Sequence, residues 1–438
     1  MYAQAGMSMA GKSHEESPPD LVREGEQLLR VSVVTLCGRE AATLSLPPTA
    51  TVREMQKLVA STTGVAMHQQ SLVVGSSVLA SSASLEDSGI TDGTLITLVV
   101  APPGRFVLTA SQDCSAKLWD VKTLECTQTF LGHEDGIISA AFSADSSIVL
   151  TASKDGSARL WSTETGLCLQ ILAGPRSCLT SASFSPSCEA VFTTYDGRSA
   201  RLWSAASGEC LQVIGSHKVP MNSAAFSPDG SLLLTTADDC RARLWSALSG
   251  KLLRTLVGHI DFVISGVFTP DGSLMVTASY DGTARLWSAC TGEFLRALCG
   301  HKDWLRAAIV SPDSAQAVSI SNDRSAKLWR LQDGESLCHF IGHTGSVTMA
   351  SFSPDSAQIL TASEDGCAKL WSAQDGACLW SFCSQSTALL SAKFSPQGTL
   401  AITVSGDGGA NLWDLTTHQF LGPIMGHGGP VTSATFSP

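Results

Sequence analysis

The chain has 438 residues, a formal net charge of −11 and a hydrophobic content of 44%. An acidic chain of this kind argues against a general nucleic-acid-binding surface, which normally carries a basic stripe. Its 14 cysteines include no C-x-x-C pair, so we predict no metal site and no cofactor. We expect reduced thiols, with a repeated set that acts as small buried apolar residues: Cys126, Cys168, Cys210 and Cys378.

Residues 1–28 are rich in Ser, Glu, Pro and Gly and contain no apolar run. This composition predicts a disordered tail. The sequence shows neither a secretory signal nor an apolar segment long enough to cross a membrane. We therefore expect a cytoplasmic protein without membrane contacts, with the nucleus as the second expectation.

Residues 29–101 change to a pattern of short strands around one helix. Thr51 and Glu54 form a capping box, which marks the first turn of the helix. The expected strands cover residues 29–38, 42–46, 72–74 and 95–100.

This order of elements resembles ubiquitin, and the resemblance implies a small α+β domain of the β-grasp fold. In ubiquitin an apolar patch of three side chains binds partners, and these map to Leu36, Val73 and Val99. The chain continues through residues 101–104 where ubiquitin ends in Gly-Gly, so the domain should act as a module within this chain. The patch either binds a second factor or packs on the rest of the protein.

From residue 102 to residue 438 the chain repeats a unit of 42 residues. Each unit ends a strand with Leu-Trp, has a Ser or Thr ten residues before the Trp, and carries a turn Asp or a Gly-His in most copies. The eight tryptophans are Trp119, Trp161, Trp203, Trp245, Trp287, Trp329, Trp371 and Trp413. The unit resembles the WD repeat, which implies a mainly β protein built as a propeller of four-stranded blades.

In WD repeats a His, a Ser or Thr, an Asp and a Trp form a buried hydrogen-bonded tetrad, and six blades have the complete set. The implied tetrads are His427, Thr109, Asp113 and Trp119; His133, Thr151, Asp155 and Trp161; His217, Thr235, Asp239 and Trp245; His259, Thr277, Asp281 and Trp287; His301, Ser319, Asp323 and Trp329; His343, Thr361, Asp365 and Trp371. In the two other blades Pro175 and Gln385 replace the His. We expect these two blades to be the least well tied.

A Ser or Thr, a His and an Asp in one unit also invite a catalytic-triad interpretation. Near-copies in most blades argue against it, because a nucleophile needs one exposed hydroxyl beside an oxyanion hole. We therefore predict no catalytic residues and no enzyme activity.

The repeat is circular, because the register of the last residues continues at residue 103. The simplest arrangement is an eight-bladed propeller in which a C-terminal strand at residues 431–436 completes a blade whose other strands come from residues 105–130. A seven-bladed ring with a surplus unit is the rival. The strand at residues 95–100 could also compete for the same place in the split blade.

Side chains that vary between blades should mark the face where partners bind. Phe262, Tyr280 and Trp304 are large aromatics in columns that border this face in WD-repeat proteins. Exposed Trp and Tyr are frequent binding hot spots. We predict a partner site at these residues together with Lys302, Asp303 and Asn322. The alternative is that Phe262 and Trp304 only fill space between blades.

The leading functional hypothesis is a non-catalytic adaptor for proteins or peptides, monomeric within a larger complex. The alternatives are a substrate receptor of a ubiquitin ligase, which would make it a ubiquitin-pathway component, and an assembly factor of a large complex. A Trp-Asp-x-Arg motif is typical of cullin-linked WD-repeat receptors, whereas residues 119–122 and 413–416 lack the Arg.

Overall fold

The computed structural model describes residues 28–35, 40–63, 70–74, 77–79, 83–100, 105–175, 177–195, 199–214, 219–383 and 387–438. Of the tail expected at residues 1–28, only Leu28 is among them. The chain separates into two compact units, Met1–Ala101 and Pro102–Pro438.

The first unit is a five-stranded sheet with one helix. Its elements are β1 (Leu29–Thr35), β2 (Glu40–Leu46), α1 (Val52–Thr63), β3 (Gln70–Val74), β4 (Ser77–Val78) and β5 (Leu95–Val100). The strand order is β2-β1-β5-β3-β4, and β1 and β5 run parallel. Apolar residues of the sheet pack on one face of α1, with Val31, Val33, Val52, Met55 and Ile96 fully buried. Burial of this face holds so small a domain together.

The predicted capping box of α1 is confirmed. The backbone N–H of Thr51 donates to Glu54 Oε2 at 2.7 Å, and the N–H of Glu54 donates to Thr51 Oγ1 at 3.2 Å. The two bonds satisfy N–H groups that have no partner inside the helix.

The second unit consists of eight four-stranded antiparallel sheets, each built from consecutive strands except the one that joins the two ends of the unit. That sheet is β37 (Val431–Phe436), β6 (Phe106–Ser111), β7 (Ser115–Asp120) and β8 (Cys126–Leu131). The next three are β9 (Ile137–Phe142), β10 (Ile148–Ser153), β11 (Ser157–Ser162) and β12 (Cys168–Ala173); β13 (Leu179–Phe184), β14 (Ala190–Tyr195), β15 (Ala200–Ser204) and β16 (Cys210–Ile214); β17 (Met221–Phe226), β18 (Leu232–Ala237), β19 (Arg241–Ser246) and β20 (Leu252–Val257). The last four are β21 (Val263–Phe268), β22 (Leu274–Ser279), β23 (Ala284–Ser288) and β24 (Phe294–Leu298); β25 (Leu305–Val310), β26 (Gln316–Ser321), β27 (Ser325–Arg330) and β28 (Ser336–Ile341); β29 (Val347–Phe352), β30 (Gln358–Ser363), β31 (Cys367–Ser372) and β32 (Cys378–Cys383); β33 (Leu389–Phe394), β34 (Leu400–Ser405), β35 (Ala410–Asp414) and β36 (Gln419–Ile424).

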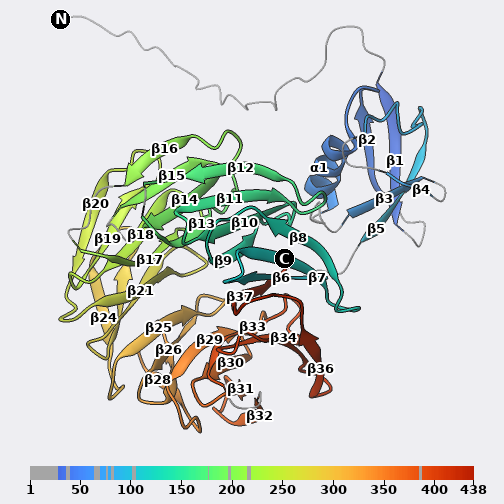
Figure 1. Cartoon of the computed structure of the whole chain (residues 1–438). Coiled ribbons are helices and arrows are strands. Elements are labelled where there is room, and N and C mark those ends of the chain that lie inside the picture. Colours follow the sequence, from blue (N-terminus) through green and yellow to red (C-terminus); the bar gives the residue numbers. More distant parts are fainter. Residues whose placement is uncertain are drawn as a thin grey trace, which may run out of the picture. The chain divides into compact units, whose positions relative to one another are not determined.

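The eight sheets form a closed ring, the eight-bladed propeller (Figure 1). The first strands of neighbouring blades contact one another and make the inner wall, whereas the fourth strands lie at the outer edge. β37 pairs with β6, with Ala434 opposite Thr109, so the end of the chain completes the first blade. β5 pairs with β1 and β3 inside the first unit, and it does not compete for this place.

Each blade packs its tryptophan against the preceding blade. Trp371, for example, joins Val318, Leu328 and Phe340 of the neighbouring blade in one buried cluster. Because each buried cluster of the propeller contains residues of two adjacent blades, no blade buries its faces alone.

Five of the six implied tetrads are present in full. In one of them the Trp161 indole N–H donates to Thr151 Oγ1 at 2.8 Å, which lies 2.7 Å from His133 Nε2, while His133 Nδ1 lies 2.7 Å from Asp155 Oδ2. The same bonds join the tetrads of His259, His301, His343 and His427 at 2.7–3.0 Å. His217 lies outside the described residues, although Trp245 donates to Thr235 at 2.8 Å in that blade.

The electrostatics of a tetrad favour a neutral imidazole beside an ionised carboxylate. Burial lowers the pKa of His133, and Asp155 offsets this only in part. Burial raises the pKa of Asp155, but hydrogen bonds from Ser157, His133 and the backbone outweigh it and lower the pKa to about 2. The imidazole Nδ1–H therefore donates to Asp155, and Nε2 accepts from the Thr151 hydroxyl.

The blade that has Pro175 in place of His uses a tyrosine instead. Tyr195 is fully buried, and the Thr193 hydroxyl donates to the Tyr195 hydroxyl at 3.3 Å. The Trp203 indole still donates to Thr193 at 2.8 Å. Tyr195 thus fills the volume beside the threonine that an imidazole fills elsewhere. In the other irregular blade Trp413 donates to Thr403 at 2.9 Å, and Gln385 lies outside the described residues.

The expectation of buried, reduced cysteines is wrong in two respects. Cys126, Cys168, Cys210 and Cys378 are exposed, because their column lies on the fourth strand of each blade, which has solvent on its outer side. Cys367 and Cys383, opposite each other on β31 and β32, form a disulfide.

Candidate partner-binding face

Three aromatic side chains lie together on one face of the propeller, beside the loops that carry the tetrad histidines. Phe262 directly precedes β21, Tyr280 follows β22, and Trp304 precedes β25. The loops of two neighbouring blades therefore supply the group, which we call the aromatic cluster. The sequence predicted this proximity from the repeat columns, and the structure brings the three residues together.

The rings of the aromatic cluster are in direct contact. Tyr280 and Trp304 stack with ring centres 4.7 Å apart and an interplanar angle of 14°, and Phe262 lies 6.1 Å from Tyr280. Phe262 and Trp304 remain 41% and 49% exposed, respectively. A large part of each of these two side chains is therefore open to solvent.

The backbone fixes the positions of these rings. The N–H of Tyr280 donates to the Phe262 carbonyl at 3.0 Å, and the N–H of Asn322 donates to the Trp304 carbonyl at 2.9 Å. The Ser321 hydroxyl donates to the same carbonyl at 2.9 Å. The cluster therefore rests on hydrogen-bonded strand ends.

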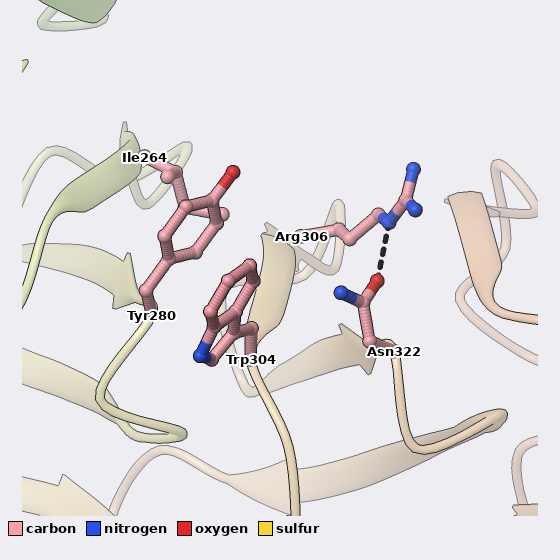
Figure 2. Close-up of a pocket in the computed structure, with 5 residues that line it drawn as sticks. All are labelled: Ile264, Tyr280, Trp304, Arg306 and Asn322. Carbon is pink, nitrogen blue, oxygen red and sulfur yellow. Dashed lines mark hydrogen bonds between the residues drawn. The ribbon is translucent and has the colours of Figure 1, made fainter.

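A hollow of about 310 Å³ opens beside Trp304. Its lining residues, which define the Trp304 hollow, are Ile264, Tyr280, Trp304, Arg306 and Asn322. Figure 2 shows the indole between the Tyr280 ring on one side and the Arg306 and Asn322 side chains on the other. The hollow thus combines an aromatic wall with a cationic one.

Arg306 is held in place by two side chains. Its Nε donates to Asn322 Oδ1 at 2.6 Å, and an Nη donates to Glu364 Oε1 at 2.6 Å. The Arg306 and Glu364 side chains are 36% and 42% exposed, so the ion pair is solvated.

Three of the predicted site residues do not line the hollow: Phe262, Lys302 and Asp303. Lys302 contributes its backbone N–H to Asp323 at 3.0 Å, and its side chain is exposed. Asp303 accepts from the N–H of Trp304 at 2.8 Å and so shapes the turn. Asn322, the third predicted polar residue, lines the hollow.

Arg306 was not among the predicted site residues, although a comparison with the equivalent positions of the other repeats marks it as unusual. The seven equivalent positions of the other inner strands are uncharged: Ile138, Thr180, Asn222, Ile264, Thr348, Leu390 and Thr432. A single cation in an otherwise neutral column at the start of an inner strand is the pattern that would have found it.

The ubiquitin-like patch is described only in part. Val73 lies half-buried on β3, opposite Thr97 of β5 and Val78 of β4. Leu36 and the side chain of Val99 lie outside the described residues.

The tetrads do not have the geometry of a catalytic site. The hydroxyl-bearing residue is fully buried, as at Thr109, Thr151 and Thr277, and its oxygen already accepts the indole N–H. A nucleophile must reach substrate, which these oxygens do not. In the described parts of the chain no three His, Cys, Asp or Glu side chains gather as a metal ion would require, and none of the described helices has the length and apolarity to span a bilayer.

Comparisons with known proteins agree with this architecture. The family model described as "WD domain, G-beta repeat" matches residues 124–162, 166–204, 208–246, 250–288, 292–330, 334–372 and 376–414. Each of the seven matches runs from the fourth strand of one blade through the first three strands of the next. The remaining unit of this kind, β36, β37, β6 and β7, is divided between the two ends of the propeller. The model of the ubiquitin family matches residues 31–103.

One solved structure with a similar fold is that of the computationally designed Ika8 protein. It is 27% identical in sequence, has a TM-score of 0.65, and the alignment covers 71% of this chain and 93% of that one. A search of curated proteins gave no significant match. The chain belongs to the WD40 repeat family and carries a ubiquitin-family domain ahead of its repeats.

Proposed function

We propose that this protein is a non-catalytic adaptor whose propeller binds a protein or peptide partner at the aromatic cluster, while the ubiquitin-family domain recruits a second factor. WD40 repeats and a ubiquitin-like domain together make a protein-interaction scaffold in general terms. The observation that supports the finer proposal is the stack of half-buried Tyr280 on exposed Trp304, at strand ends joined by backbone hydrogen bonds. Aromatic side chains held by the backbone and left open to solvent are the usual hot spots of protein interfaces.

The experiment compares proteins captured from cell lysate by the full chain and by variants. Replacing Tyr280 and Trp304 together with Ala should remove one set of captured proteins. Ile341→Ala is the matched control, because Ile341 is 69% exposed on the outer strand β28, away from the cluster. A folded Tyr280→Ala/Trp304→Ala variant that captures the same proteins as the unmodified chain would contradict the proposal.

A substitution in the ubiquitin-family domain tests the second half of the proposal. Val73→Asp places a charge at the described position of the ubiquitin-like patch. An adaptor predicts that this variant and the aromatic variant lose different proteins. If both lose the same proteins, the two domains do not serve separate partners.

A further inference from the structure

The polar groups around the Trp304 hollow are mainly hydrogen-bond donors. Arg306 contributes a guanidinium group, Tyr280 a hydroxyl, and Asn322 an amide nitrogen. The Asn322 carbonyl oxygen is already used, since it accepts from Arg306 Nε at 2.6 Å. Figure 2 shows the Asn322 amide nitrogen turned toward Trp304, away from that bond. A ligand that enters here therefore meets donors and needs acceptor atoms.

Arg306 is oriented but not saturated. Asn322 and Glu364 engage Nε and one Nη group, and no described residue accepts from the other Nη group. Because both side chains of the Arg306–Glu364 pair are partly exposed, an incoming anion can share or replace Glu364 at small cost. A planar guanidinium fixed in this way is suited to a carboxylate, which it can bind through two parallel bonds.

The aromatic wall restricts what accompanies the anion. Tyr280 covers one face of the Trp304 indole at 4.7 Å, so that face has no room for a ligand group. The other side of the indole looks toward Arg306 (Figure 2). A cation placed there would gain from the indole face but would be repelled by the guanidinium, whereas an apolar or aromatic side chain beside a carboxylate satisfies both walls.

We propose that the Trp304 hollow recognises a linear peptide segment in which Asp or Glu lies next to an apolar or aromatic residue. The carboxylate binds Arg306 and the Asn322 amide, and the neighbouring side chain packs on Trp304. This inference rests on the proposed function, in which a partner docks on the aromatic cluster, and it adds the chemistry of that partner.

The first test selects peptides from a random library displayed on phage, using the full chain as bait. Selection on the unmodified chain and on Arg330→Gln should enrich Asp or Glu beside an apolar residue. Arg330 is a matched control, because it is a partly exposed Arg paired with the acids Asp333 and Glu335 at a different site. Selection on Arg306→Gln should lose the acidic preference, and selection on Arg306→Glu should favour Lys or Arg instead.

The second test measures affinities of the most enriched peptide, made synthetically with a fluorescent label. Arg306→Gln should weaken binding about 10- to 100-fold, as loss of a charge-assisted hydrogen bond does. Glu364→Gln should strengthen binding by about two- to five-fold, because the competing acid is gone. A gain of affinity is not expected from a variant that merely disturbs the fold. Exchanging the peptide's acid for its amide should have no further effect on Arg306→Gln.

Several results would overturn the inference. These are enrichment of Lys or Arg on the unmodified chain, enrichment of apolar residues without an acid, an acidic preference that persists in Arg306→Gln, or no enrichment at all. A phosphoserine peptide that binds more tightly than its Asp and Glu counterparts would show that the site takes phosphate. If Trp304→Ala abolishes binding and Arg306→Gln does not, the proposed function stands and this inference fails; if neither substitution matters, both fail.

Discussion

Tyr195 lies directly against Gly174 in the blade that has Pro175 where other blades have a histidine. A Cβ atom at residue 174 would overlap the Tyr195 phenol. The tyrosine takes the volume of the missing imidazole, and the glycine leaves room for its hydroxyl. The irregular blade is thus filled by one substitution, Tyr195, which lies beside a glycine that most other blades also carry at this position. A buried void would instead cost packing energy.

This relationship predicts a non-additive pair of substitutions. Gly174→Ala should cost about 1–3 kcal/mol of unfolding free energy through overpacking, and Tyr195→Ser should cost about 3–5 kcal/mol by opening a cavity. In the Tyr195→Ser background the added methyl has space, so Gly174→Ala should cost close to nothing. Urea unfolding of the four proteins measures the coupling, and additive costs would show that the two residues do not share the space.

The buried histidines predict that acid weakens the propeller. Burial lowers the pKa values of His133, His301, His343 and His427 below the ordinary value of 6.5. As pH falls below about 6.5, the unfolded chain takes up protons that the folded chain does not, so stability decreases by up to about 1.4 kcal/mol per pH unit for each histidine. A second loss should follow as pH falls from about 3.8 toward 2, since hydrogen bonds outweigh burial and lower the pKa values of Asp113, Asp155 and Asp323 to about 2.

Urea unfolding between pH 7.5 and pH 5 checks the histidine part. His301→Gln should reduce the slope of the unfolding free energy against pH by the contribution of one histidine. The exposed His418 has a positive φ of 56°, so His418→Asn is the compatible control. Stability that rises on acidification would refute the assignment of neutral buried imidazoles.

The disulfide between Cys367 and Cys383 predicts a redox-dependent stability. It closes a loop with a sequence separation of 16 residues, which corresponds to roughly 3 kcal/mol of stabilisation. A reductant should therefore lower the melting temperature of the unmodified chain and of Cys378→Ser, a free cysteine on the same strand. The reductant should leave the melting temperature of Cys383→Ser unchanged. Alkylation of Cys367 and Cys383 in the absence of reductant would show that the bond does not form.

The repeat predicts the contacts that every blade makes in the same way. A buried indole needs an acceptor ten residues earlier, so the column of hydroxyls beside the tryptophans predicts the bonds that all eight blades form. The disulfide could also have been predicted from the repeat. Ser325 pairs with Ile341 in the preceding blade, and Cys367 and Cys383 occupy the same two positions one repeat later.

The features that the sequence did not predict depend on contacts between residues at different positions of the repeat. Arg306 donates to Glu364, which is 58 residues away on the next blade. The two residues occupy different positions of the repeat, so comparing equivalent positions does not reveal the pair. Tyr195 is visible as the odd member of a column of small residues, but its reach into the place of the histidine depends on side-chain direction. The exposure of Cys126 follows from the outer position of β8, which apolarity alone does not reveal.

Lys393 on β33 predicts a substitution that stabilises the protein. The equivalent positions of the other inner strands are Ala141, Ser183, Ala225, Val267, Ile309, Ser351 and Thr435. Burial lowers the pKa of Lys393, and no described acid or acceptor holds its ammonium group. The folded chain therefore carries the cost of a poorly solvated charge, and Lys393→Met should raise the unfolding free energy at pH 7 by about 1–3 kcal/mol.

The pH dependence separates this cause from a gain in packing. A lysine whose folded pKa is lowered destabilises the protein most at pH values below that pKa, and the penalty disappears as pH rises toward 10.5, the ordinary value. The advantage of Lys393→Met should thus shrink between pH 7 and pH 10.5 in urea unfolding. Lys251→Met, at an exposed lysine, should match the unmodified chain throughout. An advantage that stays constant with pH would mean that the methionine stabilises by packing and that the lysine charge was already well solvated.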